Sequence, residues 1–169
     1  MKAYLDRLLA NWPLVAALVS ALMLAIAHAF ETFGGLAPCT LCLKAREVYW
    51  VALTVGLGLF LAGRFITDDR VRRIGGLLLA VIFLVGVGVA VYHAGAEWKF
   101  WPGPQSCAAG GAGVNLDSLD AILKGAKIKP PACDEAAWVF LGLSMAGWNG
   151  LVSLGLTALS VMAVRRPRD

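Results

Sequence analysis

The stretch IGGLLLAVIFLVGVGVAVY, residues 74–92, decides the fold of this protein because it runs for nineteen residues without a charge. An α-helix rises about 1.5 Å per residue, so about 20 apolar residues cross the hydrocarbon core of a bilayer. Three further apolar runs lie along the chain: Trp12–Phe30, Val48–Ala62 and a run from about Leu143 to Val164. The sequence therefore predicts four membrane-spanning helices.

The whole chain has the composition of a membrane protein. Of its 169 residues, 59% are hydrophobic and 15% are charged, and the mean hydropathy is +0.73. Soluble domains are about 45–50% apolar and about 25% charged. This composition excludes a soluble enzyme, a disordered chain and a nucleic-acid-binding module, and unbroken runs argue against a membrane β-barrel. We predict an all-α, four-helix membrane bundle that forms a single domain over residues 1–169, with spans at about 12–31, 43–65, 74–93 and 143–164.

The basic residues predict the orientation of the bundle. Residues 1–11, 63–73 and 165–169 hold nine Lys or Arg, whereas the longer segments 31–47 and 93–137 hold six. By the positive-inside rule, both termini are then cytoplasmic. We interpret the first span as retained, because its apolar run is longer than that of a signal peptide. All four cysteines fall on the outer side, which is an oxidising compartment in a bacterium.

The outer segment at about residues 94–142 is the longest hydrophilic part of the chain. It opens with the sequence EWKFW at 97–101, whose aromatic and charged residues suit a membrane interface. Asn115 can cap a short amphipathic helix that lies on the membrane surface. The apolar face of that helix would consist of Leu116, Leu119, Ile122 and Leu123.

The strongest chemical signal is the pair Cys39-x-x-Cys42 at the mouth of the second span. Thiols at this spacing can close a small disulfide, which is the arrangement used in thiol–disulfide exchange. The dipole at the start of a helix favours a thiolate at Cys42, and Arg46 lies one turn further along the same face. The alternative for Arg46 is an interfacial side chain that only reaches the lipid headgroups.

The second pair, Cys107 and Cys133, encloses an interval of 26 residues rich in Gly and Pro. This spacing permits either an exchange relay or a structural disulfide that stabilises the loop by about 3–4 kcal/mol. We favour the relay. Structural zinc prefers two close cysteine pairs or nearby histidines, so we predict no metal site.

Other polar residues near the spans have simpler interpretations. His28 and His93 could ligate haem as a pair, but histidine near the interface is readily solvated. His93 alone is a better candidate for donating a hydrogen bond to a quinone carbonyl. Glu31 and Glu97 are interpreted as solvated charges at the boundary, and Asn149 as an interhelical hydrogen-bond donor.

Three stretches carry a family resemblance: GLAPCTLC at 35–42 followed by Arg46, WPGPQSC at 101–107, and CDEAAWVFLGLSM at 133–145. With the four spans and the order of the cysteines, they make the chain resemble the disulfide bond formation protein B (DsbB) family of bacterial inner membranes. Two departures accompany the resemblance. Glu31 stands where a glutamine is expected, and the stretch from His93 to Cys107 is about one residue longer.

The resemblance implies a protein-dithiol:quinone oxidoreductase. Cys107 would be attacked by a reduced periplasmic thioredoxin-like oxidase of the DsbA type, and Cys133 would pair transiently with Cys39. Cys42 would then be a free thiolate against the quinone ring. Arg46 would stabilise the thiolate and the negative charge that develops on the quinone. Two electrons would reduce ubiquinone or menaquinone and restore the Cys39–Cys42 disulfide.

Three rival functions are kept as alternatives. The first is a membrane protein with two structural disulfides and no enzymatic activity, and the second is a metal- or haem-binding bundle. The third is an oxidase like vitamin K epoxide reductase, for which we expect the C-x-x-C late in the chain. The sequence does not determine the quinone type, the partner, the resting cysteine pairing or the oligomeric state.

Overall fold

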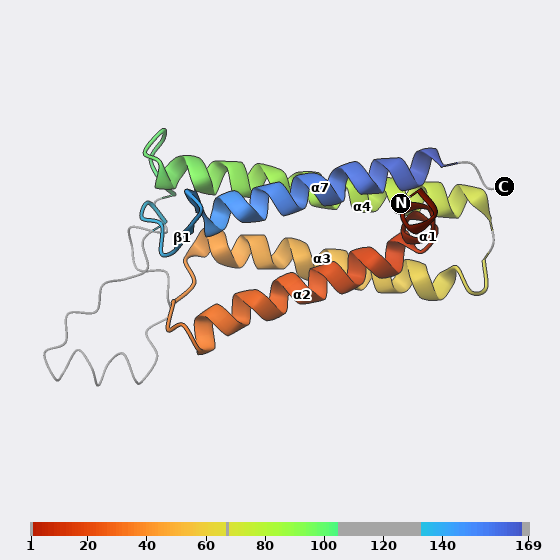
Figure 1. The fold of residues 1–169 in the computed structure, drawn as a ribbon, viewed down its shortest axis with the longest axis horizontal. Coiled ribbons are helices and arrows are strands. Elements are labelled where there is room, and N and C mark those ends of the chain that lie inside the picture. Colours follow the sequence, from red (N-terminus) through yellow and green to blue (C-terminus); the bar gives the residue numbers. More distant parts are fainter. Residues whose placement is uncertain (1, 67, 105–132, 167–169) are drawn as a thin grey trace, which may run out of the picture.

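Four long helices lie side by side in the computed structural model, which describes residues 2–66, 68–104 and 133–166 (Figure 1). They are α2 (Trp12–Thr32), α3 (Thr40–Ala62), α4 (Asp69–Glu97) and α7 (Met145–Arg165). Each is long and apolar enough to cross a membrane. The predicted all-α bundle of four membrane helices is therefore confirmed. The predicted surface helix around Leu116–Leu123 lies outside the described residues.

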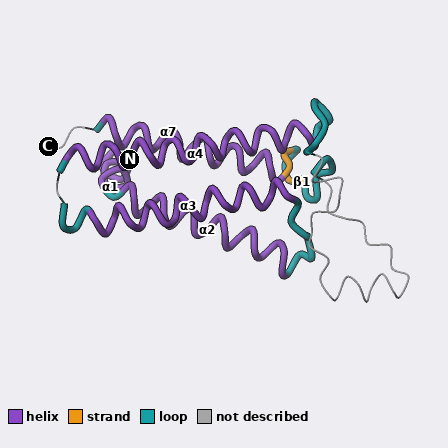
Figure 2. The backbone as a smooth tube through the Cα atoms, turned by 180° about the vertical axis from the view of Figure 1, so that it is seen from behind, coloured by secondary structure: helices purple, strands orange, loops and turns teal. Residues whose placement is uncertain are grey.

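A fifth helix precedes the bundle. α1 (Lys2–Ala10) lies across the end of the bundle where both termini are found. Within the bundle, α4 packs mainly on α7 and α2 packs mainly on α3, so the four helices form two pairs. The same arrangement is visible from behind, with the four long helices running along one axis (Figure 2).

Side-chain caps explain where three of the long helices begin. Asp68 accepts a hydrogen bond from the Arg70 N–H at 2.8 Å, so α4 starts before the uncharged run rather than at residue 74. Ser144 accepts one from the Gly147 N–H at 3.2 Å and starts α7. The sulfur of Cys39 caps α3 in the same way. Asn11 does not cap α2, because its Nδ2 donates to the Arg7 carbonyl instead.

A short hairpin that the sequence did not predict precedes α7. Strands β1 (Val139–Phe140) and β2 (Leu143–Ser144) are antiparallel, with Val139 opposite Ser144. Leu141 and Gly142 form the turn with φ of 51° and 77°. Two positive φ values are what a type I′ hairpin turn requires, and glycine adopts the second without strain.

Small residues allow α4 to approach its neighbours closely, as expected for membrane helices. A Cβ added at Gly76 would lie 2.6 Å from Val164 on α7, and one at Gly75 would lie 2.6 Å from Leu59 on α3. At Gly86 an added Cβ would meet Ser153 at 3.1 Å. Gly88 differs, because nothing lies within 4 Å of its added Cβ.

Buried hydrogen bonds join helices that are far apart in sequence. Trp12 Nε1 on α2 donates to Ser160 Oγ on α7 at 3.0 Å. The Tyr49 hydroxyl on α3 donates to Asn149 Oδ1 on α7 at 2.6 Å. Asn149 therefore makes the predicted interhelical bond, although it accepts the hydrogen rather than donating it.

The two ends of the bundle differ in chemistry. The termini and several arginines gather at one end, where Arg72 on α4 donates to the Ala163 carbonyl at 3.0 Å. Arg166 bonds Asp6 at the same end and so ties α7 to α1. The start of α3 and the β-hairpin lie at the opposite end (Figure 1). The described cysteines belong to this second end.

Candidate functional site

The cap of α3 brings two thiols together. Cys39 has extended backbone angles, φ −77° and ψ 170°, and its sulfur accepts the Cys42 N–H at 3.3 Å. This geometry places the sulfurs of Cys39 and Cys42 at 3.1 Å from one another. Both cysteines are free thiols. Only a small change is needed to close a disulfide between sulfurs this near to one another.

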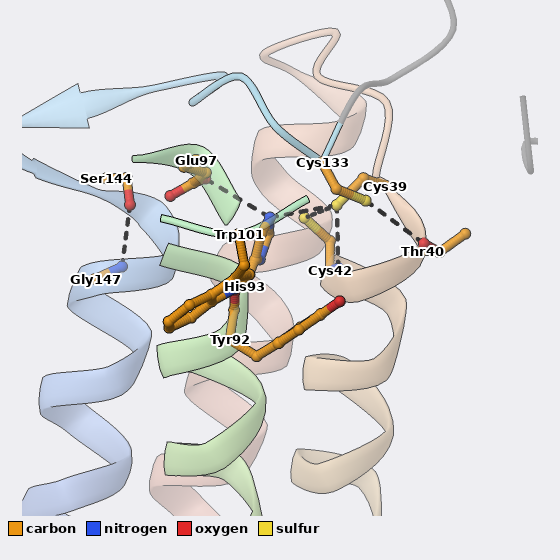
Figure 3. A network of polar contacts seen from close by, with 10 residues as sticks. All are labelled: Cys39, Thr40, Cys42, Tyr92, His93, Glu97, Trp101, Cys133, Ser144 and Gly147. Carbon is orange, nitrogen blue, oxygen red and sulfur yellow. Dashed lines mark hydrogen bonds and ion pairs between the residues drawn. The ribbon is translucent and has the colours of Figure 1, made fainter. Parts of the chain in front are cut away.

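Cys133 lies directly beside this dithiol, although it is 94 residues from Cys39 in the chain. The two cysteines form one buried cluster, with 0% of Cys133 and 5% of Cys39 exposed. Cys133 Sγ is also 3.5 Å from the Thr40 hydroxyl (Figure 3). Cys133 is itself disulfide-bonded. A disulfide and a reduced dithiol therefore pack together. Cys107 lies outside the described residues.

His93 reaches the dithiol from α4. Its Nε2 is 3.5 Å from Cys39 Sγ and 3.7 Å from Glu97 Oε1, one helical turn further along α4. His93 is 7% exposed and the Glu97 side chain is 5% exposed. The interpretations of both residues as solvated groups at the interface were therefore wrong.

The chain after α4 turns back on the end of that helix. Lys99 adopts a positive φ of 62°, and the Phe100 N–H bonds back to the Gly95 carbonyl at 2.9 Å. Trp101 then stacks on Tyr92 and donates to the Tyr92 carbonyl at 2.8 Å. The chain thus folds back over the end of α4 instead of leaving it. The spacing of four residues between His93 and Glu97 was the one sequence signal for this pair.

Electrostatics at the helix start favour a thiolate at Cys39. The hydrogen bond from the Cys42 thiol, and the hydrogen bond and charge of His93, lower the pKa of Cys39 from 9.0 to about 4. Burial acts in the opposite direction. The sequence argument assigned the helix-end effect to Cys42, whereas in the structure the sulfur that accepts the helix N–H is that of Cys39.

Arg46, one helical turn after Cys42 on α3, joins α3 to α2. Its Nη1 is 2.5 Å from Glu31 Oε2, and its Nη2 donates to the Ala27 carbonyl at 3.1 Å. The Arg46 side chain is 15% exposed. Glu31 is therefore an ion-pair partner and not simply a solvated charge. A guanidinium has five N–H donors, so three remain after these two bonds.

The donor atoms of Cys39, Cys42 and His93 lie within 4.8 Å of one another. A closed structural zinc site has four ligands, and the described residues bring three donor atoms together here. Two of these donor atoms are the sulfurs of Cys39 and Cys42, which are hydrogen-bonded to each other. The arrangement therefore suits redox chemistry. His28 contacts the Leu24 carbonyl of its own helix at 2.9 Å.

An apolar groove of about 400 Å³ runs between α4 and α7 near the same end. Its walls are almost entirely apolar and include Trp98, Trp101 and Leu151. The thiols do not line it. The groove can accept a hydrocarbon chain but does not bring that chain to the sulfurs.

Comparison with known proteins identifies the family to which these features belong. The family model described as "Disulfide bond formation protein DsbB" matches residues 9–163. The chain belongs to the DsbB family. It is 34% identical over 161 residues to disulfide bond formation protein B of Marinobacter nauticus, covering 90% of this chain and 91% of that protein. With the protein of the same name from Methylococcus capsulatus it shares 31% identity over 157 residues, covering 88% and 90%.

Membership of the DsbB family gives the site a chemical context. A DsbB-family protein with four membrane-length helices is a disulfide-forming membrane oxidoreductase. The described part of this chain contains a free dithiol, a disulfide-bonded cysteine and a buried histidine within one cluster. Thiols and disulfides are the groups that disulfide exchange interconverts.

Proposed function

We propose that this DsbB-family protein is a protein-dithiol:quinone oxidoreductase. It would reoxidise a periplasmic thioredoxin-like oxidase of the DsbA type and pass two electrons to a membrane quinone. The observation that carries the proposal is the contact between two sulfur centres. The free dithiol of Cys39 and Cys42 packs against Cys133, which is disulfide-bonded.

The outer pair, Cys107 and Cys133, receives electrons from the partner in this proposal. A thiolate of the partner attacks Cys107 Sγ, the bond to Cys133 breaks, and Cys133 leaves as a thiolate. Cys133 Sγ then attacks Cys39 Sγ of the Cys39–Cys42 disulfide, and Cys42 leaves as a thiolate. The packing of Cys133 against Cys39 supports this step, because attack requires contact between the two sulfurs.

Two further exchanges return the outer pair to its oxidised form. The mixed disulfide joins one sulfur of the partner to Cys107. The second thiolate of the partner attacks that partner sulfur, and Cys107 leaves as a thiolate. Cys107 then attacks Cys133 Sγ, and Cys39 leaves as a thiolate. The partner has now lost two electrons, and Cys39 and Cys42 hold them as free thiols. The cysteine states in the structure, with Cys39 and Cys42 free and Cys133 in a disulfide, match this product.

The thiolate preference of Cys39 supports the direction of these exchanges. A thiol with a low pKa is a good leaving group, and a disulfide that contains it is easily reduced. The pKa of Cys39 is lowered to about 4 by the Cys42 thiol and by His93. An easily reduced Cys39–Cys42 disulfide is what an oxidant of other dithiols requires.

A bound quinone supplies the two-electron acceptor that allows the Cys39–Cys42 disulfide to form again. The chain offers residues of suitable chemistry near Cys42, which is partly exposed. Arg46 lies four residues on, with three N–H donors left for a carbonyl oxygen. His93 provides a second donor near the sulfurs. We assign the quinone ring to Cys42, Arg46 and His93, since the α4–α7 groove is not lined by the thiols.

The proposed location is the bacterial inner membrane with both termini in the cytoplasm and the cysteines in the periplasm. Two features support it. The termini lie together with Arg72 and Arg166 at one end of the bundle, and the thiols lie at the other end. Basic residues remain preferentially on the cytoplasmic side. Disulfide exchange needs the oxidising side.

The test is quinone reduction by the purified protein in detergent with a reduced DsbA-type partner. Ubiquinone and menaquinone are supplied in separate reactions, and quinone absorbance is followed. We expect turnover by the unaltered chain and none by Cys39→Ala or Cys42→Ser. Glu47→Gln is the matched control, because this carboxylate is 62% exposed and pairs with Lys44 on the outside of α3. Normal turnover by Cys42→Ser, or none by the unaltered chain with both quinones, would reject the proposal.

A further inference from the structure

One ring nitrogen of His93 lies between two groups that can each carry negative charge. His93 Nε2 is 3.5 Å from Cys39 Sγ and 3.7 Å from Glu97 Oε1 (Figure 3). A thiolate and a carboxylate both accept hydrogen bonds and donate none. An Nε2 without hydrogen would therefore point a lone pair at two acceptors. The geometry favours a hydrogen on Nε2.

The second observation concerns the carboxylate itself. The Glu97 side chain is 5% exposed, and its Oε2 is buried without a hydrogen-bond partner among the described residues. A buried carboxylate without compensation is costly, so buried charges are normally paired. In the described structure, the basic side chain within ion-pair distance of Glu97 is His93. Glu97 is thus a buried titratable group that the exchange chemistry above does not use.

Other charged groups around His93 do not take over this role. The thiols of Cys39 and Cys42, at the start of α3, face His93. Cys133, from the segment before β1, is in a disulfide and does not titrate. The nearby cation of α3, Arg46, is bonded to Glu31 and to a carbonyl of α2. His93 is therefore the basic group of the described cluster, and Glu97 is its carboxylate.

We propose that Glu97 is a positioning residue that holds a proton on His93 Nε2 and thereby stabilises the Cys39 thiolate. The step is a proton transfer without redox change: the S–H bond of Cys39 breaks and an N–H bond forms at His93. Glu97 balances the resulting ring charge and fixes the ring between sulfur and carboxylate. The thiolate preference of Cys39 described above agrees with such a pair.

Removal of the Glu97 carboxylate shifts the titration of Cys39 in a direction that depends on whether Glu97 acts through His93 or directly on Cys39. If Glu97 acted on Cys39 directly, the two anions would repel, and removal of the carboxylate would favour the thiolate. If Glu97 acts through His93, removal of the carboxylate weakens the ring charge, and the thiolate is lost. The two routes shift the titration of Cys39 in opposite directions.

The consequence for catalysis rests on the proposed function, but the thiolate can be measured without partner or quinone. The experiment uses a full chain in which Cys42, Cys107 and Cys133 are each replaced by Ser, so that Cys39 is the single thiol. The rate of alkylation by iodoacetamide is measured from pH 3 to pH 9 in detergent. The same profile is measured for Glu97→Gln, His93→Ala, the two combined, and the exposed control Glu47→Gln.

We expect Glu97→Gln to move the midpoint of the alkylation profile to higher pH by about one unit or more. Glu47→Gln should leave the midpoint unchanged. In the His93→Ala background, Glu97→Gln should no longer raise the midpoint. A midpoint that moves to lower pH, or that does not move, would overturn the proposal. A failure of quinone turnover would not affect this result, so the two proposals fail separately.

A second measurement covers the case in which Glu97→Gln does not fold. The reduced chain with unaltered Glu97 is labelled with ¹⁵N-histidine, and His28→Ala identifies the His93 signals. We expect both ring nitrogens of His93 to carry hydrogen at pH 7. A neutral ring at that pH would contradict the proposal without any change at position 97.

Discussion

The Tyr49 hydroxyl donates to Asn149 Oδ1 at 2.6 Å and lies 3.1 Å from Ser153 Oγ, which links α3 to α7 across the bundle. Extensive packing joins α3 to α2 and to α4 instead. This polar contact therefore holds together helices that share little apolar surface. Hydrogen bonds between membrane helices contribute about 0.6 kcal/mol on average and up to about 1.7 kcal/mol.

Tyr49→Phe should lower the free energy of unfolding in detergent by about 1 kcal/mol, because Asn149 and Ser153 lose their shared partner. Unfolding is followed by circular dichroism as denaturant is added. Tyr4→Phe is the matched control, since Tyr4 is 74% exposed on α1. Equal stability of the Tyr49→Phe chain and the unaltered chain would show that the contact contributes nothing.

Gly95→Ala should displace the turn that follows α4. A Cβ at this position would lie 2.0 Å from the Trp101 ring, which is stacked on Tyr92. Overpacking of this kind costs about 1–3 kcal/mol, and the tryptophan fluorescence should shift as Trp101 moves. Gly88→Ala on the same helix is the control, because nothing lies within 4 Å of its added Cβ. An unchanged spectrum for Gly95→Ala would contradict the described position of Trp101.

Arg46→Ala should raise the KM for quinone about tenfold or more, if the guanidinium donates to a carbonyl as proposed, since hydrogen bonds from charged groups contribute about 1.5–3 kcal/mol. Glu31→Gln should change it less, because an amide oxygen can still accept from Arg46 Nη1. Lys44→Ala is the control, as Lys44 is exposed and pairs with Glu47. A KM that is equal in all three variants would remove Arg46 from the quinone site.

The stability of the reduced protein should depend on pH through Cys39. Its pKa is about 4 in the folded state, against 9.0 for an ordinary thiol. A depressed pKa stabilises the fold above the ordinary value, and this contribution is lost as the pH falls toward 4. The unfolding midpoint should therefore decline between pH 9 and pH 4 in the reduced chain. Cys39→Ser should flatten this dependence, and an identical slope in both chains would count against the thiolate.

The parts of the fold that could be predicted from the sequence depend on contiguous residues. The uncharged run at 74–92 requires a membrane helix whatever surrounds it. The pair Cys39-x-x-Cys42 follows Pro38, so a helix start at the motif could be expected. The hairpin was missed because Val139–Leu143 is apolar and continues into the run of α7, and only the turn at Gly142 interrupts it.

The parts of the site that could not be predicted depend on where distant segments meet. Glu97 stands at the end of an apolar helix, where the sequence suggests a solvated charge, yet its side chain is 5% exposed. The pairing of Arg46 with Glu31 needs the relative position of α2 and α3. The adjacency of Cys133 to Cys39 was expected only from family resemblance, since the spacing of the four cysteines permits three pairings.

The arrangement of the chain ends has a practical consequence. Both termini lie at the end of the bundle remote from the start of α3, where Cys39 and Cys42 stand. An affinity tag or fluorescent fusion at either terminus would therefore keep clear of the sulfurs. Protein immobilised through such a tag would present the end of the bundle that holds the cysteines to the solution. Binding of a reduced partner could then be followed on a sensor surface without steric interference from the attachment.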